Sequence, residues 1–137
     1  MPDDSPSITL VRSYIEAVRR ARASGDIDDF EALREFLAAD LVIKAASPWT
    51  DEPWQVLHQG ADALITRLQA PINKATSLTT ENVTVQQAGD DVYVEQLSTI
   101  VDSDGTHASM VCHIFSVVDG VITGVRGYRN DRGLPAG

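Results

Sequence analysis

The chain has 137 residues and a mass of 14.8 kDa, a length that suits one domain around one hydrophobic core. Its composition, 43% hydrophobic and 23% charged, is that of a globular protein and excludes a disordered chain. Eleven Lys and Arg stand against twenty Asp and Glu, and the resulting net charge of -9 repels phosphate backbones and anionic lipid head groups. We therefore expect neither nucleic acid nor a membrane as a partner.

The cysteine content and the start of the chain indicate where the protein works. Cys112 is the only cysteine, which excludes an intrachain disulfide and a CxxC motif. The first residues, MPDDSPS, lack the basic and apolar regions of a signal peptide, and no eighteen apolar residues follow one another. These features predict a soluble cytoplasmic protein.

The first predicted element is an amphipathic helix that follows a flexible tail at residues 1–7. Its apolar residues recur at spacings of three and four and form one stripe: Ile8, Val11, Ile15 and Val18. The basic residues are expected mostly on the opposite face: Arg12, Arg19 and Arg22. The helix is expected to end near Gly25, because glycine accommodates the left-handed backbone conformation that follows a helix.

Two further helices and a strand are predicted before residue 70. Asp28 precedes Glu31 by three residues, as in a capping box, and so marks the start of a second helix. Residues 41–46 are mostly apolar and predict a short strand, whereas SPWTDEPW after them predicts a loop because its prolines lack backbone donors. A third helix is expected over residues 61–69, before Pro71.

From Leu78 onward the apolar period becomes two, which predicts four antiparallel strands. Turn residues separate them at 88–91, 102–105 and 119–120, and Asp119-Gly120 is typical of a two-residue type I′ hairpin. Three helices and a strand followed by such a meander indicate an α+β domain with helices on one face of a curved sheet. We expect a pocket for a small molecule between these two layers.

Three motifs carry a resemblance to a known family: Tyr14 ahead of Gly25-Asp26, HQGADAL at residues 58–64, and DGVI at 119–122 with YRND at 128–131. In this order they resemble the nuclear transport factor 2-like superfamily, and in particular its SnoaL-like members. The resemblance covers residues 8–131 and leaves 132–137 as a flexible tail. It implies a conical, cystatin-like roll of three helices on a curved antiparallel sheet, and a homodimer formed through the outer face of that sheet.

The same resemblance predicts which mechanisms of the superfamily are missing. Epoxide hydrolase-like members carry an arginine and two aspartates in the cavity, and the matching positions here hold Gln96, Ser98 and Gly127. Ketosteroid isomerase-like members use a helix tyrosine, which Tyr14 matches, and two acids, whose positions here hold Cys112 and Ala45. Neither mechanism is therefore expected in the form that those relatives use.

Two residues are predicted to carry chemistry. Tyr14 would donate a hydrogen bond to a ligand carbonyl, and His58 would move a proton, because an imidazole titrates near neutrality. The alternative for each is structural, with Tyr14 as a core residue and His58 as a loop or capping residue. Neither a metal nor a cofactor is expected, since His107 and His113 stand about 20 Å apart along one strand and no third ligand joins them.

Six further residues are predicted to line the pocket or its mouth: Trp49, Trp54, Gln96, Ser98, Cys112 and Arg129. The two tryptophans would form an aromatic wall, or they would instead plug the open end or pack in a dimer. Arg129 would hold an anionic oxygen, unless it pairs with Asp131. A second choice stays open, in which Glu95, His113 and Tyr128 face inward, because a slip by one residue exchanges the two faces of a strand.

These observations predict an isomerase, cyclase or dehydratase that needs no cofactor and acts on an apolar ligand, such as a polycyclic or aromatic molecule. The alternative is a non-catalytic ligand-binding or dimerisation module. A structure that brings Tyr14 and His58 within hydrogen-bond reach of one point would favour the enzyme.

Overall fold

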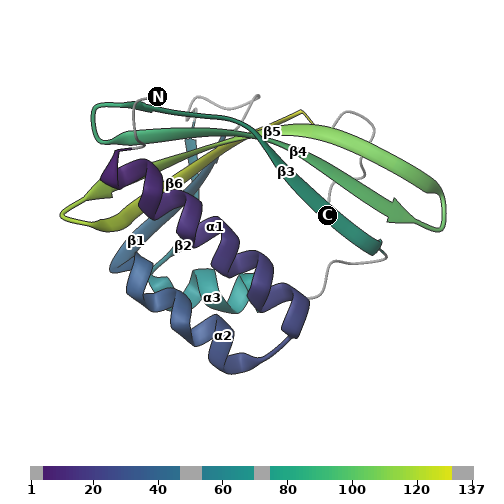
Figure 1. Cartoon of the computed structure of the whole chain (residues 1–137), viewed down its shortest axis with the longest axis horizontal. Coiled ribbons are helices and arrows are strands. Elements are labelled where there is room, and N and C mark those ends of the chain that lie inside the picture. The colour runs from purple at the N-terminus through teal and green to yellow at the C-terminus, as the bar shows by residue number, and fades with distance from the viewer. Residues whose placement is uncertain (1–4, 47–53, 70–74, 131–137) are drawn as a thin grey trace.

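The computed structural model describes residues 5–46, 54–69 and 75–130. The helices are α1 (Pro6–Ser24), α2 (Ile27–Glu31) with the 3-10 helix η1 (Ala32–Phe36) directly after it, and α3 (Ala61–Gln69). The strands are β1 (Leu37–Ala46), β2 (Trp54–Gln59), β3 (Ala75–Ala88), β4 (Asp91–Asp102), β5 (Gly105–Val118) and β6 (Val121–Asn130). The helices cover one face of the sheet (Figure 1), which confirms the expected α+β architecture.

The strands form one six-stranded sheet in the order β2-β1-β6-β5-β4-β3. All neighbours are antiparallel except β1 and β6, which are parallel, so the sheet is mixed rather than purely antiparallel as expected. Strand β2 starts inside the segment that was predicted as a loop. It pairs with β1 at the edge of the sheet, where one partner suffices and a weak strand pattern is tolerated.

Helix α1 begins and ends at residues with clear capping roles. The side-chain oxygen of Ser5 accepts a hydrogen bond from the backbone nitrogen of Ile8 at 3.2 Å, and its hydroxyl also donates to Gln87 on β3. At the other end Gly25 has a φ of 67°, and its N–H donates to the carbonyl of Ala21 at 2.8 Å. These contacts fix the N-terminal end of α1 to β3 and end the helix where the sequence predicted.

The second helix is capped two residues earlier than predicted. The carboxylate of Asp26, rather than that of Asp28, is the N-cap and accepts from the Asp28 backbone nitrogen at 3.0 Å. The following residues place Phe30 and Leu33 in the core, at 5% and 0% exposure. The short segment α2–η1 therefore packs by two large apolar side chains despite its acidic surface.

Two tight turns set the register of the central strands. Ser103 and Asp104 form a two-residue turn between β4 and β5, so even-numbered residues of β4 lie opposite odd-numbered residues of β5. Asp119 and Gly120 connect β5 and β6 with φ values of 53° and 80°, as a type I′ hairpin requires. A register shift between Ser116 and Val117 then shifts the pairing of β5 with β6 by one residue.

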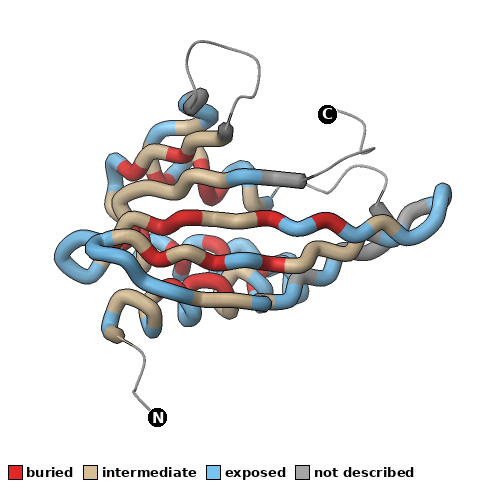
Figure 2. The backbone as a smooth tube through the Cα atoms, turned by 90° about the horizontal axis from the view of Figure 1, so that it is seen from above, coloured by how far each residue is buried: buried red, intermediate tan, exposed pale blue. Residues whose placement is uncertain are grey.

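The core lies between the sheet and the helices, and buried residues recur along the central strands (Figure 2). Alternation places these strand residues on the face that the helices cover: Val92, Val94, Phe115, Val117 and Ile122. They pack with residues from the helices and from β1: Val11, Ile15, Phe30, Leu33, Leu41 and Ile43. Among the described helices, none has the length and apolar character to span a bilayer.

Candidate functional site

A hydrogen-bonded chain of polar side chains lies on the face of the sheet that the helices cover. Gln96 Nε2 donates to Asn82 Oδ1 at 3.0 Å, and Gln96 Oε1 lies 3.1 Å from His113 Nδ1. The register explains these contacts, because Asn82 lies opposite Gln96 and Val94 lies opposite His113. Gln96 is 8% exposed. Side chains from β3, β4 and β5 thus hold one imidazole in a defined orientation.

The network assigns the tautomer of His113. Because the amide nitrogen of Gln96 donates to Asn82, its oxygen faces the imidazole and accepts from Nδ1. In the neutral ring the lone pair then belongs to Nε2. His113 is half-buried, so the side chain keeps some accessible surface. This arrangement of an oriented imidazole suits general acid–base chemistry.

Gly127 on β6 provides the space that this imidazole occupies. The two residues lie opposite each other, and a Cβ built on Gly127 would lie 3.1 Å from Cδ2 and 3.5 Å from Nε2 of His113. Relaxed carbon–carbon contacts lie at about 3.5–4.0 Å, so any larger residue would press on the ring. Gly127 therefore has a steric role, because the absence of a side chain there leaves room for the ring of His113.

Tyr14 on α1 lies close to this imidazole across one shared aromatic neighbour. Its ring packs edge to face against Phe36 and Phe115, with centroid distances of 6.1 Å and 5.9 Å. The ring of Phe115 is also 6.1 Å from that of His113. Two distances of about 6 Å from a common ring put the Tyr14 and His113 rings no more than about 12 Å apart.

The hydroxyl of Tyr14 is a hydrogen-bond donor held in an apolar setting. The residue is 6% exposed, and burial raises the pKa of the phenol well above its ordinary value, while the charge of Arg22 acts in the opposite direction. No described residue hydrogen-bonds to this hydroxyl, and no described polar side-chain atom is both fully enclosed and without a partner. The hydroxyl therefore stays protonated and keeps a small accessible surface through which it can meet a ligand.

Arg22 lies on the apolar stripe of α1 rather than on the opposite face, and this corrects the expectation from the sequence. It follows Val18 by four residues and Val11 by eleven, spacings that keep all three on one side of the helix. Its side chain is exposed, yet the protein around it lowers the pKa of the guanidinium by burial. The nearby Tyr14 phenol raises that pKa, and the charge of Arg67 on α3 lowers it.

The predicted lining residues divide between the two faces of the sheet. Gln96 and Ser98 share the inner face with Val94, because residues two apart in a regular strand point the same way. Cys112 lies opposite Glu95 and Tyr128 and so faces away from the helices, which corrects its predicted place in the lining. Burial and, second, the Glu95 carboxylate raise the pKa of its thiol.

The error at Cys112 has a local cause that the sequence contains. A two-residue turn at 103–104 requires Gln96 to lie opposite Val111, so it excludes Cys112 from the face of Gln96. The same turn brings His113 to the inner face beside Val94. The turn residues Asp102-Ser103-Asp104-Gly105 therefore predict that His113 lies on the inner face, whereas the family resemblance predicted the outer face.

His58 is a strand residue rather than a helix start. It lies in β2 opposite Ile43, which in turn lies beside Val125, and Val125 lies opposite Phe115. His58 and Phe115 are thus three strand spacings apart, about 14 Å along the sheet. Phe115 contacts the rings of both Tyr14 and His113, whereas it lies three strands away from His58.

Three predicted residues fall wholly or partly outside the described part of the chain. Trp49 lies outside the described residues. The backbones of Trp54 and Arg129 belong to β2 and β6, and their side chains lie outside what the structure describes.

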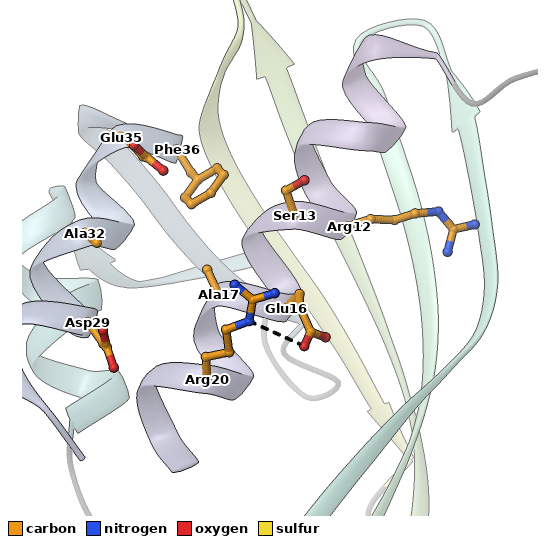
Figure 3. Close-up of a pocket in the computed structure, with 9 residues that line it drawn as sticks. All are labelled: Arg12, Ser13, Glu16, Ala17, Arg20, Asp29, Ala32, Glu35 and Phe36. Carbon is orange, nitrogen blue, oxygen red and sulfur yellow. Dashed lines mark ion pairs between the residues drawn. The ribbon is translucent and has the colours of Figure 1, made fainter. Parts of the chain in front are cut away.

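A separate groove of about 500 Å³ lies on the outer side of the helices, between α1 and α2–η1 (Figure 3). Its walls carry charges of both signs, including Arg20 and Glu16, which form an ion pair at 3.8 Å. Glu16 also pairs with Arg19 at 3.0 Å. The groove contains none of the predicted site residues, so we do not assign the chemistry to it.

No group of three His, Cys, Asp or Glu side chains within the described ranges has the arrangement of a metal site. The side chains that come together on the inner face are instead amides, one imidazole and one phenol. Such groups orient ligands and transfer protons.

Comparisons with known proteins agree with the fold. A family model described as SnoaL-like domain matches residues 11–125. A candidate polyketide cyclase from Xanthomonas campestris pv. campestris is similar with 25% identity and a TM-score of 0.66, over 93% of this chain and 92% of that one. An LEH-like epoxide hydrolase from M. tuberculosis is similar with 20% identity and a TM-score of 0.64, over 94% of this chain and 86% of that one. A nuclear transport factor 2-like protein from Anabaena variabilis has 15% identity and a TM-score of 0.68, over 96% of this chain and 95% of that one. No curated protein matches the chain.

Proposed function

Because the chain belongs to the SnoaL-like domain family, we propose that it is an acid–base enzyme, an isomerase, cyclase or dehydratase, acting on a small and largely apolar molecule. The observation that supports this proposal best is the Asn82–Gln96–His113 chain, which orients an imidazole on the inner face of the sheet. The similarity to a candidate polyketide cyclase is consistent with this reaction class. The proposed reaction needs proton transfer and no resident cofactor.

In the proposed mechanism, His113 and Tyr14 act on the same carbonyl compound. Nε2 of His113 takes a proton from the carbon next to the carbonyl group, and the Tyr14 hydroxyl donates a hydrogen bond to the oxygen on which negative charge develops. The protonated imidazole then returns the proton to a different atom of the substrate, which completes an isomerisation, a ring closure or the loss of water. Gln96 is a positioning residue, because it acts through His113.

His58 remains the alternative base, and the two histidines are distinguished by their relation to Phe115, the ring on which Tyr14 packs. Phe115 bridges Tyr14 and His113, whereas two strands separate Phe115 from His58 along the sheet. A carbonyl compound that is hydrogen-bonded to Tyr14 and packs on Phe115 would also lie beside His113. The proposal assigns the proton transfer to His113 for this reason.

A generic enolisation assay tests this assignment without knowledge of the natural substrate. The probe is 2-tetralone, a neutral bicyclic ketone, and its exchange of α-hydrogens for deuterium in D₂O is followed by NMR spectroscopy. We expect the wild-type protein to accelerate exchange over buffer, and the His113→Asn variant to lose at least about 100-fold of that acceleration. The His58→Asn variant is the matched control and should retain it.

Two results would contradict the proposal. If His113→Asn exchanges as fast as the wild type while His58→Asn is slow, His58 is the base. If the wild-type protein binds 2-tetralone with no acceleration of exchange, the alternative of a non-catalytic ligand-binding or dimerisation module gains support. The homodimer predicted from the resemblance, and the cytoplasmic location, are tested separately by light scattering and by cell fractionation.

A further inference from the structure

Two arginines, Arg22 on α1 and Arg67 on α3, have no carboxylate partner among the described residues, in contrast to Arg19 and Arg20 on α1. On the outer side, Arg19 and Arg20 both pair with Glu16. On the stripe that faces inward, Arg22 has no ion pair or hydrogen bond with the described residues, and neither has Arg67 on α3. The electrostatic neighbours of Arg22 are the Tyr14 phenol, which is neutral while protonated, and a second cation, Arg67, with no described carboxylate among them. Within the described part of the chain, two like charges are thus neighbours without an anion between them.

The arrangement of the helices explains how these groups meet. Side chains on a helix lean toward its N-terminus, so the long Arg22 side chain reaches back along α1 toward the level of Tyr14. Helices α1 and α3 are in contact, which brings the last turn of α3, with Arg67, to the end of α1 (Figure 1). The arginine stems can cover apolar surface while their guanidinium groups stay at the rim.

The Tyr14 hydroxyl is an independent observation that points to a ligand at the same place. Its side chain is more than nine-tenths buried, and no described residue supplies it with a hydrogen-bond partner. The hydroxyl keeps a small accessible surface, at which a ligand oxygen can accept its hydrogen bond. Arg22 is a neighbour of both the Tyr14 phenol and Arg67, so these three groups form a set of donors without an acceptor, and this set suits an oxyanion.

We infer that the substrate of the reaction proposed above carries an anionic group, a carboxylate or a similar oxyanion, and that Arg22 and Arg67 bind it beside the Tyr14 hydroxyl. This inference rests on the proposed function and names its substrate class: an organic acid with an apolar body. Arg22 and Arg67 hold the acid end at the meeting of α1 and α3, and the carbonyl end extends toward His113. Guanidinium groups suit this role because their planar donor pairs match the two oxygens of a carboxylate.

The test compares two fluorescent probes that differ by one anionic group. 8-Anilinonaphthalene-1-sulfonate and N-phenyl-1-naphthylamine share the same ring system, but only the first carries a sulfonate, and the second is neutral. We expect the wild-type protein to prefer the sulfonate, and Arg22→Gln and Arg67→Gln each to weaken its binding by about tenfold, with little change for the neutral probe. Arg22→Lys should keep part of the preference, because it keeps the charge. Arg20→Gln on the outer side is the matched control and should bind both probes like the wild type.

Two outcomes would overturn the inference, provided that circular dichroism shows each variant folded. One is an unchanged sulfonate affinity in both arginine variants. The other is an equal loss of affinity for both probes, which would show that the arginines support the apolar site without recognising the anionic group. The comparison involves no proton transfer, so its failure would leave the exchange result for His113 standing, and a failure of exchange would leave the probe preference standing.

Discussion

Replacing Gly127 by alanine tests whether the position of the imidazole, and not merely its presence, matters. The added methyl group would lie 3.1 Å from Cδ2 of His113, whereas carbon atoms in relaxed contact are about 3.5–4.0 Å apart. The ring must therefore move by a few tenths of an ångström. Because β5 lies between β6 and β4, this movement displaces the ring toward β4 and disturbs the 3.1 Å hydrogen bond between Nδ1 and Gln96.

The magnitude follows from two opposing effects. Overpacking of this kind costs about 1–3 kcal/mol, whereas a Gly-to-Ala change in a compatible backbone stabilises by about 0.4–1 kcal/mol through the unfolded state. We expect Gly127→Ala to lose about 1 kcal/mol of unfolding free energy and about tenfold of the exchange rate with 2-tetralone, because small displacements of a catalytic group are costly. Urea unfolding measures the first quantity and NMR exchange the second.

Gly124 offers a matched control in the same strand. A Cβ there would meet nothing closer than the Val42 carbonyl oxygen at 3.5 Å, and Gly124 lies opposite Ser116, away from the imidazole. Gly124→Ala should therefore keep the exchange rate and the ¹⁵N signals of the His113 ring. If Gly127→Ala gives the same rate and the same ring signals as Gly124→Ala, the steric relation between Gly127 and His113 has no functional meaning.

Three further replacements probe the phenol, the core and the outer face. Burial raises the pKa of Tyr14 above its unfolded value near 10, so the contribution of its neutral phenol to stability is complete below pH 10 and falls as the pH rises above it. In urea titrations, the unfolding free energy of Tyr14→Phe should therefore decline less between neutral and alkaline pH than that of the wild type. An equal decline in both proteins would contradict this. Leu41→Ala should lose about 2–5 kcal/mol in the same assay because Leu41 is fully buried, whereas Ile27→Ala, at a residue 64% exposed, should change little. Cys112→Ser should retain 2-tetralone exchange, since Cys112 faces away from the helices, and a loss of exchange would return Cys112 to the lining.

Local chemistry in the sequence predicted the helices and hairpins well. Gly25 ends α1 because its left-handed backbone completes the cap, and Asp119-Gly120 closes its hairpin with two positive φ values. Both features depend on a few neighbouring residues. The parallel pairing of β1 with β6 joins segments about eighty residues apart, and no short-range pattern specifies it. Strand β2 was missed for the same reason, because its pairing with β1 supports a sequence that alone has little strand character.

The candidate site was harder to predict because it depends on register. Gln96 was placed on the inner face, but its partner His113 was assigned to the other face of its strand. One residue of register in β5 exchanges Cys112 for His113, and this changes the chemistry from a weakly reactive thiol to an imidazole. Arg22 was misplaced by a different error. A charged residue at the end of an apolar stripe was counted with the polar face, although its spacing from Val18 and Val11 belongs to the stripe.

The neutral and the charged groups of the proposed site lie at different places, so the site can bind a substrate in one orientation. Amides orient His113, and a phenol supplies the second donor, so these groups position a reacting carbonyl without adding formal charge. The guanidinium groups of Arg22 and Arg67 instead lie toward the ends of α1 and α3. A substrate with one anionic end and one carbonyl end would therefore bind in a single orientation, because the reverse orientation would remove its anion from both arginines. Specificity for such a molecule would arise from the distance between its two polar groups, and an apolar sheet core with Phe115 at its centre would tolerate variation in the body between them.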